Sequence, residues 1–102
     1  MIMLLAAALL ACAIPEEDFP ATYAQVTCRQ YQNCEPEDFD DVWDDRQECE
    51  DDVADLTNEL LDLADLLGQD YDEDAARDCV SNMRWASCEE FSDGDVECSV
   101  LE

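Results

Sequence analysis

Residues 45–68 read DRQECEDDVADLTNELLDLADLLG, the longest run of helical pattern in this sequence. Its apolar side chains recur at alternating steps of four and three, the spacing of one face of an α-helix. They are Cys49, Val53, Leu56, Leu60, Leu63 and Leu67. Asp45 with Glu48 three residues later predicts a capping box, and Gly68 predicts a left-handed residue after the last turn. We expect one long helix whose leucines face the core of a small bundle.

Weaker helical patterns flank this segment on both sides. The first covers about 20–33, where Phe19, Tyr23 and Val26 lie at helical spacing. The other covers about 73–86, and four of its side chains are expected to point inward: Ala76, Cys79, Val80 and Met83. We see no strand alternation. The expected fold class is therefore all-α, a small three-helix bundle stapled by three disulfides and occupying 20–102.

The connecting segments carry turn signals. Pro36 interrupts the helical pattern, so 35–43 is expected to be a loop or a single turn. Ser92 to Asp95 predicts a turn in a C-terminal tail that is otherwise without pattern. Trp43 and Trp85 are expected in or at the edge of the core, where large aromatic side chains of small bundles usually pack.

Charge and composition exclude several classes of function. The 102 residues suffice for one domain, with 29 acids against four bases, a net charge of −25 and no histidine. Such a surface repels the phosphates of nucleic acids. Histidine-dependent catalysis and histidine-ligated zinc are excluded as well. We expect no enzymatic activity.

The N-terminal segment predicts export. Residues 2–14 read IMLLAAALLACAI, and as a helix they would span about 20 Å, short of the roughly 30 Å hydrocarbon core of a membrane. That length is typical of a signal peptide. Within it, 9–12 read Leu-Leu-Ala-Cys and resemble the lipobox of bacterial lipoproteins. The alternative is an ordinary secretory signal cut elsewhere, which would release a soluble effector.

The lipobox resemblance implies a specific organisation of the chain. Residues 1–11 would be the signal peptide, Cys12 would carry the lipid, and 12–19 would be the lipidated cysteine and an acidic tether. Ala13, which follows the cysteine, favours the bacterial outer membrane, with the domain facing the periplasm or the cell surface. Several acyl chains on Cys12 would meet the requirement for stable anchoring.

The other six cysteines are expected to form three disulfides. They are Cys28, Cys34, Cys49, Cys79, Cys88 and Cys98. An even number in a short exported chain is typical of a disulfide framework, and the absence of any CxxC pair argues against a metal site. An antiparallel hairpin of the first two helices would bring Cys34 close to Cys49. For the remaining four cysteines we favour one set and leave a second open: Cys28–Cys79 with Cys88–Cys98, or Cys28–Cys88 with Cys79–Cys98.

This cysteine layout is similar to that of one family. Its spacing, Cys28-x5-Cys34, a mid-chain Cys49, then Cys79-x8-Cys88-x9-Cys98, resembles the short acidic cysteine-rich lipoproteins of myxobacterial genomes, most of them uncharacterised. The resemblance covers 12–98. It implies an envelope protein and brings no activity, ligand or catalytic residue.

The acids offer one weak metal motif. Asp70, Asp72 and Asp74 fall at positions 1, 3 and 5 of an EF-hand-type loop, but Ala75 stands where glycine is needed and Ser81 where a glutamate should be. A solvated acidic surface with diffuse counterions is the preferred interpretation. No cofactor is expected, apart from diffuse or weak Ca²⁺ association.

Together these features predict a lipid-anchored module of the cell envelope with a structural or protein-interaction role. Its contacts would be the membrane, through the anchor, and an unknown envelope protein, for which a basic partner suits the charge. The alternative is a Ca²⁺-binding envelope protein that uses the clustered aspartates or the acids of the long helix.

Overall fold

The computed structural model describes residues 13–101; the predicted signal peptide and Cys12 lie outside this range. The elements are one 3₁₀ turn and five helices: η1 Glu16–Asp18, α2 Phe19–Cys34, α3 Pro36–Val42, α4 Arg46–Leu66, α5 Glu73–Trp85 and α6 Cys88–Asp93. Within the described range the only β-pairing is an isolated bridge between Tyr71 and Leu101. The all-α fold class is confirmed.

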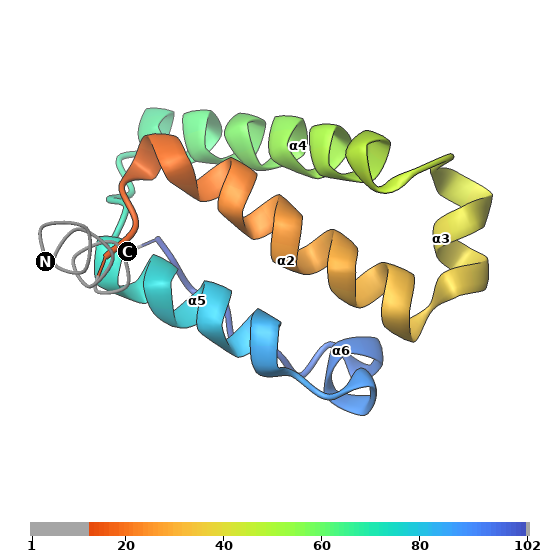
Figure 1. The fold of residues 1–102 in the computed structure, drawn as a ribbon. Helices are drawn as coiled ribbons and strands as arrows, with labels where there is room; N and C mark the ends of the chain where they lie inside the picture. The colour runs from red at the N-terminus through yellow and green to blue at the C-terminus, as the bar shows by residue number, and fades with distance from the viewer. Residues whose placement is uncertain (1–12, 102) are drawn as a thin grey trace, which may run out of the picture.

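The central element is α2, which contacts each of the other helical elements. In Figure 1 it runs between α4 and α5, while α3 closes the far end of the α2–α4 pair. Its sequence, FPATYAQVTCRQYQNC, contains no acid at all. A helix packed on two sides would have to bury carboxylates, which is costly without partners, so the acids are placed elsewhere.

The expected loop at 35–43 is instead a helix. Pro36 lies in the first turn of α3, where its fixed φ and missing N–H are compatible with a helix start. Phe39 on this helix is fully buried against the Cys28 and Cys49 side chains. The proline therefore begins a helix, and one buried aromatic side chain holds that helix on the domain.

The predicted ends of α4 are largely confirmed. The Asp45 carboxylate accepts a hydrogen bond from the Glu48 N–H at 2.9 Å, as in a capping box. The reciprocal bond differs, because Glu48 accepts from the Asp44 N–H. At the other end Gly68 has a φ of +77°, and the N–H of Gln69 donates to the Ala64 carbonyl at 2.9 Å. This is the expected left-handed helix end.

The predicted inward face of α4 is confirmed at Cys49 and Val53 and is wrong for the four leucines. The buried side chains are Cys49, Thr57, Leu61 and Ala64. They lie eight, four and three residues apart on one side of the helix, and the disulfide from Cys49 to Cys28 on α2 fixes that side toward the core. Because α4 packs mainly on the single helix α2, only this narrow strip is covered, and the leucines beside it remain exposed.

All three favoured disulfide pairings, Cys34–Cys49, Cys28–Cys79 and Cys88–Cys98, are wrong. The bridges are Cys28–Cys49, Cys34–Cys88 and Cys79–Cys98, with Cα–Cα distances of 6.0, 5.2 and 4.3 Å. Helices α2 and α4 do pack together, but α3 lies between them in the chain, so Cys49 is bridged to Cys28 and Cys34, the last residue of α2, is bridged to Cys88 at the start of α6. Cys79–Cys98 is one of the two bridges in the alternative set, Cys28–Cys88 with Cys79–Cys98. The six cysteines do form three disulfides.

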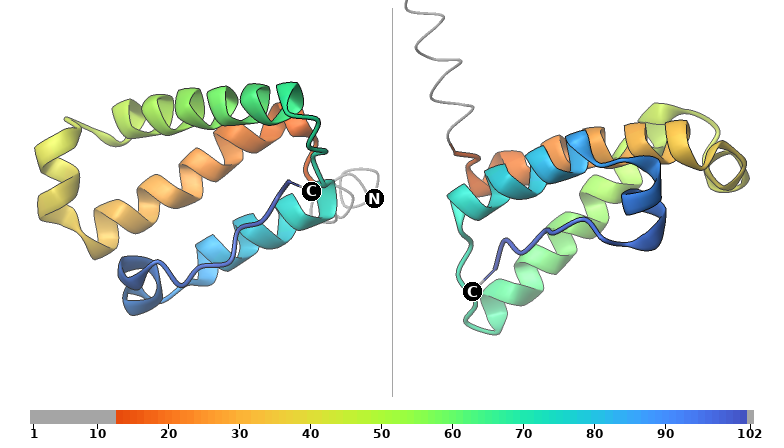
Figure 2. Two further views of the ribbon diagram at one scale, coloured as in Figure 1. Left: turned by 180° about the vertical axis from the view of Figure 1, so that it is seen from behind. Right: turned by 90° about the horizontal axis from the view of Figure 1, so that it is seen from below.

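The C-terminal tail is more ordered than expected. It runs back along α5 toward the start of that helix, behind α5 in Figure 1 and in front of it in the reverse view of Figure 2. Val96, Cys98 and Val100 pack against the core, and the Asp72 N–H donates to the Val100 carbonyl at 2.9 Å. An extended segment with alternate residues turned inward thus completes the bundle.

The core consists of two clusters. The larger comprises Phe19, Val26, Leu61, Ala76, Cys79, Val80 and Met83. The smaller comprises Cys28, Phe39 and Cys49, with Trp43 packed at its edge. Trp85 departs from expectation, because 79% of its surface is exposed. It lies two residues after the buried Met83, which places it on the opposite side of α5.

Candidate interaction surfaces

The weak metal motif is not assembled into a site. The Asp72 carboxylate accepts hydrogen bonds from the N–H groups of Asp74 and Ala75, at 2.9 and 3.0 Å, and so caps α5. Asp70 and Asp74 are exposed on either side of it. Across 13–101, no three acidic, cysteine or histidine side chains are grouped to hold a metal ion. The motif thus serves as a helix start.

Three leucines of α4 and Leu67, which caps its C-terminal end, form an exposed apolar surface, which we call the leucine face. They are Leu56, Leu60, Leu63 and Leu67, with 52–69% of each residue exposed. They recur at i, i+4, i+7 and i+11, so they lie on one side of the helix over three turns. Contiguous apolar surface of this kind is unusual on a small soluble domain and often marks an interaction site.

The leucine face continues into a hollow. Leu60 borders a cavity of about 390 Å³ between α4, the start of α2 and the tail. The cavity is lined by Phe19, Tyr23, Thr57, Leu60, Cys98, Ser99, Val100 and Leu101. A ligand lying along the leucine face could therefore insert an apolar side chain between α4 and the tail.

The surroundings of the leucine face are strongly acidic. The sequence of α4 holds eight acids and a single base, Arg46. Asp52, Asp55, Glu59 and Asp62 are all exposed between or beside the leucines. Arg46 lies at the first residue of the helix, where its guanidinium donates to the Gln32 side chain at 2.8 Å. No base therefore lies within the leucine-bearing part of α4.

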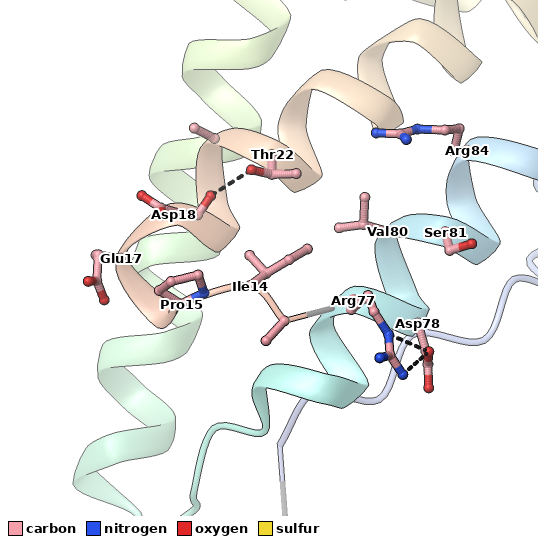
Figure 3. A pocket seen from close by; sticks show the side chains of 12 residues that line it. Ile14, Pro15, Glu17, Asp18, Thr22, Arg77, Asp78, Val80, Ser81 and Arg84 are labelled. Carbon is pink, nitrogen blue, oxygen red and sulfur yellow. Dashed lines mark hydrogen bonds and ion pairs between the residues drawn. The ribbon is translucent and has the colours of Figure 1, made fainter. Parts of the chain in front are cut away.

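A second hollow lies between α2 and α5, where the described chain begins. This cavity, of about 640 Å³, is shown in Figure 3. The apolar part of its lining consists of Ala13, Ile14, Pro15, Ala21 and Val80. Polar side chains complete the lining: Glu17, Asp18, Thr22, Arg77, Asp78, Ser81 and Arg84. Arg77 and Asp78 form an ion pair at 3.0 Å at one edge.

The arginines are concentrated on the same two helices. Of the four in the chain, Arg29 is on α2, and Arg77 and Arg84 are on α5. Arg29, Arg84 and the exposed Trp85 line a further hollow of about 240 Å³, and we call these three residues the basic face. Arg84 borders both hollows, so the basic face adjoins the cavity at the start of the chain.

The first residues of the described chain are bound to the domain. The Tyr71 hydroxyl donates to the Ile14 carbonyl at 2.7 Å, and the Ile14 N–H donates to the Glu73 carbonyl at 3.3 Å. Burial raises the pKa of Tyr71 far above its ordinary value, and Glu73 and Glu16 add to the shift. The segment expected to be a tether is therefore folded onto the domain from Ile14 onward, with η1 leading directly into α2.

No protein-family model matches the chain, and no curated protein or solved structure is significantly similar to it. Among the described helices, none has both the length and the apolar content needed to cross a membrane.

The leucine face and the basic face differ in how much of each could be predicted from the sequence. The leucines were evident but were expected to be buried, and the basic face was missed. Its signal was the absence of any acid from 19 to 34 in a chain with 29 of them.

Proposed function

We propose that this chain is a lipid-anchored, disulfide-stapled module of the bacterial cell envelope that binds a partner protein through the leucine face of α4. The observation that carries the proposal is the exposure of Leu56, Leu60, Leu63 and Leu67 beside an apolar cavity. Exposing four leucines to water is unfavourable, at roughly 25 cal/mol per Å² of apolar surface, and a docked partner removes that cost.

The chemistry of this surface points to an amphipathic helix with basic flanks. The leucine face spans the twelve residues from Leu56 to Leu67, about 16 Å along the axis, which suits three turns of a partner helix. The exposed acids beside it, including Asp52, Asp55 and Glu59, favour lysine or arginine at the edges of the contact. A second copy of this chain is disfavoured, because pairing two α4 helices would bring sixteen carboxylates together.

The anchor rests on independent features. The Leu-Leu-Ala-Cys sequence at 9–12 resembles a lipobox, and three disulfides suit an oxidising compartment outside the cytoplasm. An intact mass of the protein purified from its native membranes tests this part. We expect cleavage before Cys12 and a mass increase that matches acyl chains. A soluble product without lipid would overturn the anchor.

The binding role is tested with a defined peptide. The probe is a helical peptide of about 18 residues with leucine at helical spacing and lysine elsewhere, labelled for fluorescence anisotropy. Leu60→Asp and Leu63→Asp should each weaken binding about tenfold, because each leucine contributes about 1.5 kcal/mol on burial. Val42→Asp is the matched control, since Val42 is an equally exposed aliphatic residue on α3. It should leave the affinity unchanged.

A scrambled peptide of the same composition separates docking from charge attraction. It keeps every lysine but has no apolar face, and we expect it to bind at least about tenfold more weakly. Equal binding of the two peptides would contradict docking on the leucine face. Self-association abolished by Leu63→Asp in sedimentation would assign the leucine face to a second copy instead.

A further inference from the structure

The charge of this molecule is distributed unevenly between its sides. Helix α4 holds eight acids and α3 four, whereas α2 holds none. The exposed positions of α2 follow steps of four and are uncharged or basic: Ala21, Gln25, Arg29 and Asn33. Together with Arg84 and Trp85 they make the α2–α5 side the least negative part of a chain with a net charge of −25.

The same side lies closest to the predicted anchor. Ala13, the residue after Cys12, lines the cavity between α2 and α5, and Ile14 is held by Tyr71 and Glu73. The described chain therefore begins at the edge of this cavity, one residue after the predicted anchor. From there Arg77 follows about one turn along α5, and Arg84 two turns further, about 10 Å away.

We propose that the basic face, Arg29, Arg84 and Trp85, lies on the phospholipid headgroups of the membrane that holds the anchor. This inference rests on the lipid anchor proposed above. Guanidinium groups bind phosphate oxygens in a bidentate manner, and indole rings favour the interface between water and hydrocarbon. The long axes of α2 and α5 then run along the membrane surface, and Trp85 touches it about 20 Å from the anchor.

Two kinds of acid neighbour this side: those near the anchor or paired with arginine, and Glu90, Asp95 and Glu97, which line a hollow on the other side of Trp85. Asp78 is paired with Arg77, so the two charges compensate each other. Glu17 and Asp18 stand at the rim near the anchor, and the lipid holds that end against their repulsion. Arg29 and Arg84 are both exposed, and neither forms an ion pair with another described residue. They are therefore the groups available for phosphate.

This orientation leaves the leucine face accessible. The cavity beside Leu60 is lined by the tail, whereas the cavity between α2 and α5 has no tail residue in its lining. The two hollows use different sides of α2, with Phe19 and Tyr23 at the first and Ala21 and Thr22 at the second. A partner can thus reach α4 while the basic face rests on the membrane.

The test uses the full lipidated protein in vesicles of phosphatidylethanolamine and phosphatidylglycerol. Trp43→Phe leaves Trp85 as the only tryptophan, and circular dichroism checks that this variant keeps its helices. On reconstitution, acrylamide quenching of Trp85 should fall at least about twofold relative to the unlipidated Cys12→Ser chain, because indole enters the headgroup layer. Brominated lipids should quench Trp85 as well.

Charge-matched variants separate the basic face from net charge. Arg84→Gln should restore acrylamide quenching of the anchored protein, whereas Arg46→Gln, the same charge change on α4, should leave Trp85 shielded. Equal effects of the two variants would overturn the specific role of the basic face.

Vesicle flotation in high salt distinguishes a failure of the proposed anchor from a failure of the proposed orientation. Protein that floats while Trp85 remains fully open to acrylamide overturns the orientation alone. Protein that does not float overturns the anchor, and this inference with it.

Discussion

Tyr71 joins the two ends of the described chain to the core. Its hydroxyl donates to Ile14, its ring packs against Phe19, and its backbone pairs with Leu101. We expect Tyr71→Phe to lower the free energy of unfolding at pH 7 by about 0.5–1.5 kcal/mol, the contribution of one hydrogen bond. Urea denaturation followed by circular dichroism measures this.

Tyr71 also predicts a pH dependence. The folded pKa of Tyr71 is raised above the ordinary value of 10.0, so the folded state holds the phenol proton more tightly than the unfolded state. The corresponding stability is fully present below pH 10 and is lost as the pH rises through the folded pKa. Wild type should begin to lose stability as the pH rises above about 10, and Tyr71→Phe should lose less. Parallel pH profiles would contradict this assignment.

Substitutions at Asp72 distinguish its role as a helix cap from a role as a metal ligand. Removing its side chain in Asp72→Ala should destabilise the protein by about 1 kcal/mol, because two N–H groups of α5 lose their acceptor. Asp72→Asn should retain most of that stability, since asparagine caps equally well. Asp70→Ala is the control for the loss of one charge. A Ca²⁺-dependent stabilisation abolished by Asp72→Asn would instead restore the metal-binding alternative.

At the scale of the elements, α4 has two apolar faces, one buried at Leu61 and one exposed at Leu63. Leu61 is 9% exposed and Leu63 is 52% exposed, although they lie only two residues apart. Leu61→Ala should cost about 2–5 kcal/mol by leaving a cavity, whereas Leu63→Ala should cost well under 1 kcal/mol. Chemical denaturation of the matched pair measures both values. The reverse order would return the leucine face to the core.

Gln30 fastens the end of α5 to α2. Its side-chain amide is buried and donates to the carbonyls of Met83 and Ala86, at 2.7 and 2.9 Å. Gln30→Glu replaces that donor by a carboxylate facing the same carbonyls. We expect a loss of about 1–3 kcal/mol in the free energy of unfolding. The exposed Gln25→Glu on the same helix adds the same charge and should change stability far less.

The elements also show what the sequence could reveal. Local signals sufficed for the three long helices, the cap at Asp45 and the left-handed Gly68, because these depend on neighbouring residues. The buried side of α4 depends on a distant contact, the bridge from Cys49 to Cys28, and periodicity alone cannot supply it. The tail was missed because Val96, Cys98 and Val100 alternate over a segment too short to stand out.

At the scale of the whole molecule, net charge makes stability depend on salt. Acids four residues apart repel along α4, as in Glu48/Asp52, Asp51/Asp55 and Asp55/Glu59, by roughly 0.2–0.5 kcal/mol for each pair. Raising NaCl from about 0.1 to 1 M shortens the Debye length from about 10 to 3 Å and should remove most of this repulsion. Screening about 1 kcal/mol of this charge repulsion should raise Tm by about 5 °C.

Calcium provides the control for that experiment. If the acidic surface holds its counterions without a specific site, CaCl₂ at matched ionic strength should raise Tm no more than NaCl does. A saturable rise at micromolar Ca²⁺ would contradict a purely screened acidic surface.

The three disulfides have a consequence for how the protein withstands proteolysis. The loops Cys28–Cys49, Cys34–Cys88 and Cys79–Cys98 overlap in sequence, so every peptide bond from 28 to 98 lies inside at least one of them. A single cut in the exposed turn at Gly68 therefore leaves both fragments covalently joined. They separate on a gel only after reduction. With the proposed lipid on Cys12, a molecule nicked inside these loops would stay attached, and a single cut would shed the domain only among the fifteen residues between Cys12 and Cys28.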